Sequence, residues 1–265
     1  MIDYQKEIIK CSSDFSYFCE NYIFVKTMNV PKRFKLYDYQ KRLVSHWEKN
    51  NKSIQSKFRQ GGFTTLATIY ALWTCLFKEN QKVILCCNGD GMAQFIGDRI
   101  MKFAIATLPD WLKGNVLKMT NQYQKKFEDT NSIFILKTPK SLNTIGDPIS
   151  LLILDEIDSC FTAKQWSSVY PQIKGKVIAQ SNLSHNDTWF WGMLIDAKVK
   201  INSFAAFECN YKENPEFNEE WELEMKKNNI YWESEFEQKA IDTDIKETII
   251  EKKRKAKTCR DINEV

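Results

Sequence analysis

The chain has 265 residues, of which 43% are hydrophobic and 13% are aromatic. This is enough apolar side chain to bury the core of one α/β domain with additional elements, and it excludes disorder over most of the length. Lysine and arginine total 38 against 34 for aspartate and glutamate, so net charge neither requires nor excludes a nucleic-acid partner.

Cysteine and histidine usage argues against a zinc site. Eight cysteines are scattered without a Cys-x-x-Cys pair, and the only histidines are His46 and His185. Such cysteines favour a reduced, intracellular protein. The first residues are polar and acidic, without a signal peptide, and no apolar run approaches the roughly 20 residues that span a bilayer. We therefore expect a soluble protein that does not act on a membrane.

The hydrophobic pattern changes along the chain. Apolar residues at helical spacing predict helices within residues 1–50. From residue 51, short strand-like runs alternate with longer helical ones. Strands are expected at 53–58, 83–87, 132–136 as an edge strand, 151–154, 176–179 and 203–208, and helices at 64–77, 92–108 and 189–197. This alternation is typical of an α/β fold with a mainly parallel central sheet flanked by helices, whose ligand site lies beyond the carboxyl ends of the strands.

A glycine-rich loop, Lys-Phe-Arg-Gln-Gly-Gly-Phe-Thr-Thr, begins at Lys57 between a predicted strand and a predicted helix. A standard phosphate-binding loop, Gly-x-x-x-x-Gly-Lys-Thr, curls backbone N–H groups round phosphates that its lysine neutralises. With Gly62 at the second glycine, Thr64 supplies a magnesium-binding hydroxyl, but Phe63 stands where the lysine belongs. Another cation is needed, and Lys57 and Arg59 lie in the same loop. The loop alone is also compatible with a plain glycine turn.

A second motif is the apolar run Leu-Leu-Ile-Leu from Leu151, which ends in Asp155 and Glu156. A buried strand of this kind delivers adjacent carboxylates to its carboxyl end, one toward magnesium and the next toward an attacking water. The loop and the carboxylate strand together are far more specific than either alone. They predict a nucleotide-hydrolysing domain.

The motifs resemble, in order, those of the ATPase domain of the large terminase subunit, the DNA-packaging motor of tailed bacteriophages. The resemblance covers about residues 12–240 and rests on segments 14–18, 21–23, 36–40, 57–65 and 151–156. It implies a P-loop NTPase of the RecA-like, ASCE class with ATP and Mg²⁺ as cofactors. Many terminases have an Arg-Gln-x-Gly-x-Thr-Thr loop, and some carry its lysine at the front, so the displaced lysine fits this family.

The resemblance also implies roles for individual residues. Glu156 would be the general base, with Lys57 as the displaced loop lysine and Arg59 as a phosphate-contacting or transition-state arginine. Thr64 and Asp155 would hold Mg²⁺. The implied nucleotide-binding residues are Tyr39, Gln40, Lys57, Arg59, Gln60, Gly61, Gly62, Phe63, Thr64 and Thr65, with Gln40 reading the adenine. The residues implied to couple hydrolysis to movement, or otherwise a plain strand-end turn, are Gln180, Ser181 and Asn182.

Three regions follow from the same resemblance: an N-terminal helical lid with the adenine-side motif (1–50), a P-loop ATPase core (51–213) and a helical C-terminal subdomain or linker (214–265).

The sequence departs from the family pattern in two respects. Ile145 stands where many members have an arginine that acts on a neighbouring subunit, although Lys140 is close. The nuclease domain that follows in such terminases is not expected within this chain, because Asp242 and Asp244 alone cannot form its metal site, so the chain is expected to be either an ATPase fragment or a natural ATPase-only protein.

The expected function is ATP-driven translocation of viral double-stranded DNA into a procapsid. The implied partners are DNA, the portal protein, the small terminase subunit and further copies of the chain in a ring, within the host-cell cytoplasm. A helicase-like ATPase is one alternative, since the same motifs suit that class. A hydrolysis-deficient nucleotide-binding assembly module is another, motivated by Phe63 and Ile145. The basic segment 252–257 is either a solvated helix or a nucleic-acid contact.

Overall fold

The computed structural model describes residues 3–27, 30–114, 116–121, 123–144 and 146–239. The sequence-based expectations for Ile145, Asp242, Asp244 and the basic segment 252–257 lie outside these residues. Every cysteine among them is free. No helix in this part of the chain combines the length and apolar character that crossing a bilayer requires.

Helices and strands alternate through most of the chain. The helices are α1 (Tyr4–Ser13), α2 (Phe15–Tyr22), α3 (Asp38–Lys49), α4 (Phe63–Phe77), α5 (Gly89–Gln94), α6 (Lys102–Thr107), α7 (Asp110–Lys113), α8 (Ala163–Val169), α9 (Trp189–Lys198), α10 (Glu219–Asn228) and α11 (Trp232–Glu235). The strands are β1 (Phe24–Val25), β2 (Lys32–Arg33), β3 (Lys52–Ser56), β4 (Lys82–Cys87), β5 (Val116–Asn121), β6 (Gln124–Phe127), β7 (Ser132–Lys137), β8 (Ile149–Asp155), β9 (Ile173–Ser181) and β10 (Ala205–Phe207). A π-helical segment, Phe95–Met101, joins α5 to α6.

The main sheet has eight strands in the order β10-β3-β9-β8-β4-β7-β6-β5. Strands β10 to β7 run parallel, and β6 and β5 extend the sheet as an antiparallel hairpin. The predicted α/β fold with a mainly parallel sheet is therefore confirmed. The prediction of an edge strand at 132–136 is wrong, because β6 pairs with the outer side of β7. The polar β6, with its sequence Gln-Lys-Lys-Phe, carried no strand signal.

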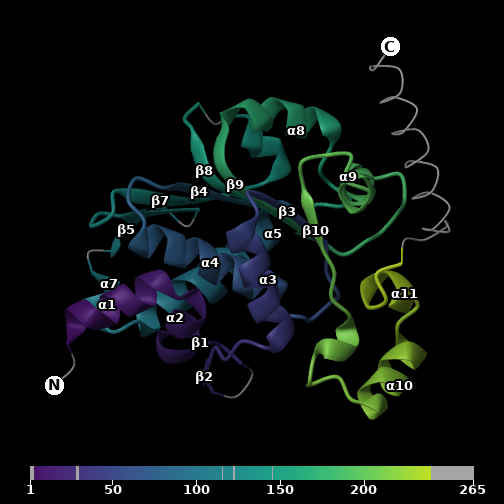
Figure 1. Ribbon diagram of the computed structural model, residues 1–265, viewed down its shortest axis with the longest axis horizontal. Helices are drawn as coiled ribbons and strands as arrows, with labels where there is room; N and C mark the ends of the chain where they lie inside the picture. The colour runs from purple at the N-terminus through teal and green to yellow at the C-terminus, as the bar shows by residue number, and fades with distance from the viewer. Residues whose placement is uncertain (1–2, 28–29, 115, 122, 145, 240–265) are drawn as a thin grey trace.

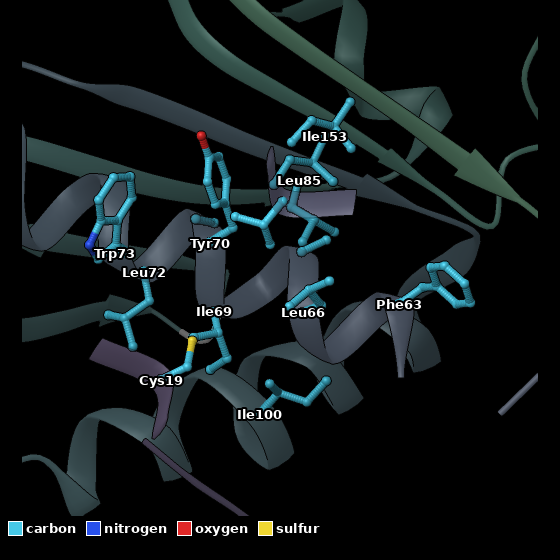
Figure 2. Close-up of a cluster of buried hydrophobic side chains, with 14 of the residues drawn as sticks. Cys19, Phe63, Leu66, Ile69, Tyr70, Leu72, Trp73, Leu85, Ile100 and Ile153 are labelled. Atoms are coloured by element: carbon cyan, nitrogen blue, oxygen red, sulfur yellow. The ribbon is translucent and has the colours of Figure 1, made fainter. Parts of the chain in front are cut away.

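The two faces of the sheet are covered by different helices (Figure 1). Leu85 and Ile153 point into a core shared with α1 to α4, whereas Ile84 and Leu152 point into a second core with α8 and α9. Strands buried on both faces read as continuous apolar runs, which explains why β4 and β8 were recognisable in the sequence. Figure 2 shows α4 lying directly against Leu85 and Ile153.

A C-terminal arm, residues 208–239, returns to the carboxyl edge of the sheet. Its aromatic residues pack on one another, with Phe217 and Trp221 stacked at a ring-centroid distance of 3.7 Å. Phe217 also contacts Phe58, which lies just after β3, at 6.0 Å. Ser56 at the end of β3 donates a hydrogen bond to Gln238 at 2.6 Å. The arm therefore contacts the chain where β3 leaves the sheet.

The central position of β8 predicts a large effect of truncating Ile153. Ile153 is fully buried, so Ile153→Ala is expected to lower the free energy of unfolding by about 2–5 kcal/mol through lost contacts and a residual cavity. Ile201→Ala serves as the control, because Ile201 is 46% exposed, and it should change stability by less than about 0.5 kcal/mol. Urea unfolding measures both. Equal effects of the two variants would contradict the packing of β8 at the centre of the sheet.

Candidate functional site

The candidate site forms where β3, β9 and β8 end beside one another in the sheet. The glycine-rich loop follows β3, while Asp155 ends β8 and Gln180 lies near the end of β9. Because parallel strands deliver their carboxyl ends to one edge, segments far apart in the sequence meet here. Backbone hydrogen bonds join them: Lys57 donates to the Ser181 carbonyl at 2.9 Å, and Glu156 donates to the Gln180 carbonyl at 3.0 Å.

The Lys57 side chain lies buried among the predicted catalytic groups. Its Nζ is 2.7 Å from Asp155 Oδ1 and 2.9 Å from Glu156 Oε1. It also donates to Thr64 Oγ1 at 3.2 Å. Burial alone lowers the pKa of Lys57, but the charges of the two carboxylates and hydrogen bonds to them reverse this effect, so the pKa lies above the usual lysine value. Lys57 is therefore a charged group held at the centre of the site.

Asp155 is fully buried and accepts hydrogen bonds from several directions. Thr64 Oγ1 donates to its Oδ2 at 2.7 Å, and Gln180 Nε2 donates to its Oδ1 at 2.8 Å. Gln55 Nε2 in turn donates to Gln180 Oε1 at 3.0 Å. This chain of polar contacts fixes the carboxylate orientation. The role of Gln55, which the sequence did not single out, comes from its register beside Gln180 across β3 and β9.

Thr64 and Asp155 fit the chemistry of a magnesium site. A hydroxyl and one carboxylate, 2.7 Å apart, match a cation that keeps most of its ligands as phosphate oxygens and water. Among the described residues, no group of three or more His, Cys, Asp and Glu side chains could hold a metal ion without such additional ligands. Mg²⁺ at these two residues would therefore complete its coordination with phosphate oxygens or water.

The loop leaves the N-terminus of α4 open. Gln60 is exposed with φ of 62°, and Gly62, the N-cap residue, has φ of 72°. No side chain in the described part of the chain caps this helix end, whose first turn contains Thr64 and Thr65. The unpaired N–H groups and the helix dipole favour an anion there.

Phe63 occupies the position of the usual loop lysine but belongs to the hydrophobic core. Its ring lies 5.1 Å from Phe58 and 5.8 Å from Tyr39, and it is almost fully buried at the start of α4 (Figure 2). A Cβ on Gly61 would lie 2.3 Å from Phe63 and 2.6 Å from Phe58. The absence of a side chain at Gly61 therefore allows these two rings to pack directly against the loop backbone.

The predicted adenine-side residues also support the loop. Tyr39 OH donates to the Gly61 carbonyl at 2.7 Å, and Gln40 Nε2 donates to the same oxygen at 3.1 Å. Gln40 Oε1 accepts from the Tyr37 backbone N–H at 3.1 Å. Both side chains are buried and have protein partners. An adenine-reading role of Gln40 stays a prediction.

Arg59 points toward the C-terminal arm rather than toward Asp155. Its guanidinium pairs with Glu235 Oε1 at 2.7 Å while 58% of the side chain remains exposed. The Arg59 backbone N–H donates to the Glu235 carbonyl at 2.8 Å, and Asn182 Nδ2 donates to the same carbonyl at 3.2 Å. Glu235 thus joins the loop to the segment after β9. No sequence pattern marked Glu235, because its importance comes only from tertiary contact.

A pocket of about 490 Å³ opens beside Glu156. Arg59, Asn182 and Glu235 line it as well. Glu156 has φ of 55° and a side chain that is 33% exposed, so its carboxylate reaches this pocket while it pairs with Lys57. Such a backbone conformation is uncommon outside glycine and is typical of functional sites.

Asp158 forms a second buried polar centre in the wall of the same pocket. Its backbone N–H donates to Ser181 Oγ at 3.1 Å, and its carboxylate accepts from the Ser184 backbone N–H at 2.8 Å and from Thr188 Oγ1 at 2.5 Å. Ser181 therefore connects the end of β9 to the segment that follows Asp155 and Glu156. Asp158 was not predicted as a site residue, although its position three residues after Asp155 was visible in the sequence.

Three solved structures with a similar fold are phage large terminases or their ATPase domains. The Thermus phage P74-26 large terminase ATPase domain has 15% identity and a TM-score of 0.62, covering 78% of this chain and 95% of that chain. The HK97 bacteriophage large terminase has 13% identity and a TM-score of 0.64, with 94% and 51% coverage. The large terminase from a thermophilic bacteriophage, in complex with ADP, has 12% identity and a TM-score of 0.61, with 76% and 52% coverage.

These similarities confirm the predicted resemblance at the level of the fold: the chain has the fold of the ATPase domain of phage large terminases. The chain spans about half the length of the HK97 protein. No protein-family model matches the sequence, and no match was found among curated proteins. Identities this low show the fold alone.

Removing the Lys57 charge should destabilise the protein and create sensitivity to magnesium. Lys57→Met leaves Asp155 and Glu156 facing each other without a cation, which should cost about 3–5 kcal/mol of unfolding free energy. Mg²⁺ should restore part of this loss because it replaces the missing positive charge. Thermal unfolding with and without Mg²⁺ measures both effects. The control is Lys82→Met, because Lys82 pairs at 2.9 Å with Asp147, an 82% exposed carboxylate. An equal loss of stability and an equal response to Mg²⁺ in the two variants would rule out the electrostatic role of Lys57.

Adding one methyl group to Gly61 should disturb the loop. Gly61→Ala forces Phe58 or Phe63 to move and is expected to lower the unfolding free energy by about 1–3 kcal/mol. In Gly192→Ala the new Cβ meets nothing within 4 Å, so this helical substitution should raise stability by up to about 1 kcal/mol. Urea unfolding compares the two. Stabilisation by Gly61→Ala would contradict the observed aromatic packing beneath the loop.

Proposed function

We propose that this chain hydrolyses ATP at the carboxyl edge of the sheet and that hydrolysis drives movement of double-stranded DNA, as in phage genome packaging. The observation that carries the proposal is the buried cluster of Lys57, Thr64, Asp155 and Glu156 beside the open N-terminus of α4. The fold supports it, since matched large terminases were solved in complex with ADP and with ATP-gamma-S.

Each residue of the cluster has a chemical task in this proposal. The backbone N–H groups at the start of α4 would bind the phosphates, and Thr64 and Asp155 would hold the magnesium ion that accompanies them. Bound Mg²⁺ supplies neutralisation of phosphate charge. Lys57 would supply the charge that Phe63 lacks, because its ammonium, which pairs with the two carboxylates, lies beside the start of α4 where the phosphates would bind. Glu156 orients the attacking water and accepts its proton.

Arg59, which lines the same pocket as Glu156, would contribute further positive charge. The guanidinium in its ion pair with Glu235 is 58% exposed, which weakens the pair, so a triphosphate could compete for the guanidinium. Transfer of Arg59 from Glu235 to the phosphates would loosen the contact between the loop and the C-terminal arm. Together with the contact of Asn182 on the same Glu235 carbonyl, this gives the proposed coupling segment 180–182 a physical connection to the arm.

The working assembly belongs to the same proposal. A ring of identical chains, docked on the portal protein and served by the small terminase subunit, would pass DNA between its subunits. Lys140, exposed on the 3-10 segment Pro139–Thr144, is a candidate for the charge that acts on a neighbouring subunit's ATP. A helicase-like activity is distinguished by strand separation, which a packaging motor does not require.

Glu156→Gln tests the chemistry directly. The amide cannot accept the water proton, so the rate of ATP hydrolysis in the presence of DNA should fall by about 10²- to 10⁴-fold while ATP binding is retained. Phosphate release measures the first and calorimetry the second. The matched control is Glu219→Gln on exposed α10. Hydrolysis that survives in Glu156→Gln sinks the proposed mechanism, and wild-type binding without hydrolysis favours the nucleotide-gated assembly module.

A further inference from the structure

The charges of the chain are unevenly distributed along its length. Residues 21–37 contain four lysine or arginine residues and no aspartate or glutamate. The C-terminal arm, residues 208–239, has ten glutamates against four lysines. The small net charge of +4 therefore hides a basic segment near the N-terminus and an acidic segment in the arm. A local excess of one sign of charge attracts a partner of the opposite sign.

The basic segment contains the two-stranded antiparallel ribbon of β1 and β2. Phe24 lies opposite Arg33, whose guanidinium is 4.4 Å from the centre of the Phe24 ring. Phe34, the residue after β2, is buried in the core, whereas Lys32 and Lys35 are exposed. The ribbon is therefore attached to the core on one side and presents cations to solvent on the other.

The neighbouring helical elements add further cations beside the ribbon. α6 contacts β1. Arg99, from the π-helical segment before α6, lines one cavity together with Lys26, the residue after β1. Lys102, the first residue of α6, is exposed as well. We call the exposed cations of the ribbon and of these helical elements the basic face: Lys26, Lys32, Lys35, Arg99 and Lys102.

Within the described ranges, no carboxylate forms an ion pair with the basic face. Nearby acidic residues have other partners. Glu20 pairs with Lys41 at 2.9 Å, and Glu216 of the arm accepts a hydrogen bond from Tyr37 OH at 2.6 Å. A single unpaired lysine on a surface is ordinary, but five such cations on adjoining elements form a surface that suits a polyanion.

We propose that the basic face binds the phosphate backbone of double-stranded DNA without regard to sequence. This inference rests on the proposed function, because a motor that moves DNA requires a surface along which the duplex passes. Lysine and arginine contact phosphates without reading bases, and a two-stranded ribbon fits the major groove. The acidic arm repels the same backbone, so the duplex lies against the ribbon and away from α10.

The salt dependence of binding tests the basic face. The triple variant Lys32→Gln, Lys35→Gln, Lys102→Gln removes three charges and none of the residues that line the cavity with Arg99. Loss of three phosphate contacts should flatten the slope of log K against log salt concentration by roughly 2.7. Fluorescence anisotropy with labelled duplexes of two unrelated sequences measures this slope, and both duplexes should give the same result.

A control variant changes the net charge equally at other exposed lysines. Lys164→Gln, Lys174→Gln, Lys227→Gln removes three cations from α8, β9 and α10. Figure 1 shows α8 on the opposite side of the sheet from β1 and β2. The control should keep the wild-type slope. Equal flattening in the two triple variants would show that only net charge matters and would overturn the basic face.

ATP hydrolysis separates this inference from the proposed function. Without DNA, the basic-face variant should hydrolyse ATP at the wild-type rate, while the DNA concentration for half-maximal stimulation should rise by the same factor as the Kd for the duplex. If the wild type binds the duplex and the basic-face variant binds it equally well, the basic face is wrong and the proposed function stands. If the wild type binds no duplex, both are wrong.

Anionic vesicles test the other partner that exposed lysines attract. Vesicles containing phosphatidylserine should not compete with the duplex for the wild-type protein at equal phosphate concentration. If the basic-face variant loses binding to these vesicles and keeps duplex binding, the face contacts membranes and the DNA inference is overturned. The six lysines of the two triple variants are exposed, so both variants should unfold at the wild-type temperature.

Discussion

The buried ammonium of Lys57 is the interaction on which the rest of the site depends. Asp155 and Glu156 are adjacent carboxylates at the end of a central strand, and one of them is wholly inside the protein. Two such charges are costly without a cation, and a lysine buried without carboxylates would be equally costly. The lysine after β3 and the carboxylates at the end of β8 therefore stabilise each other. They meet because β3 and β8 both pair with β9, one on each side of it.

The same requirement explains the unusual loop. A lysine just before the threonine would lie at the start of α4, where Phe63 instead fills the space beside Phe58 and Tyr39. In this chain the positive charge lies just after β3, on Lys57, and Phe63 belongs to the core. Aromatic rings pack against this loop and Gln40 donates a hydrogen bond to it, while its backbone N–H groups at the start of α4 have no side-chain cap and can bind an anion. On its outer side, Arg59 of the loop pairs with Glu235 of the C-terminal arm.

Parts of this structure were predictable because they obey strong local rules. Strands β4 and β8 are buried on both faces and read as apolar runs, and α4 follows two glycines at its start. The hairpin of β5 and β6 was missed because an antiparallel pair at the margin of a sheet needs no continuous apolar run, as the Lys125-Lys126 pair illustrates. The π-helical turn was read only as part of one helix, since hydrophobic periodicity does not distinguish it from an α-helix.

By itself, the sequence determined the chemistry that is available: a hydroxyl at Thr64, carboxylates at Asp155 and Glu156, and a cation that had to come from Lys57 or Arg59. Only the tertiary structure decided where those two cations lie. Lys57 lies inside because its backbone continues β3 beside β9, whereas Arg59, two residues later, lies outside the sheet and meets Glu235. The physical reason is that charge pairing depends on distance and burial, which are set by strand order and register and are not encoded in any local pattern.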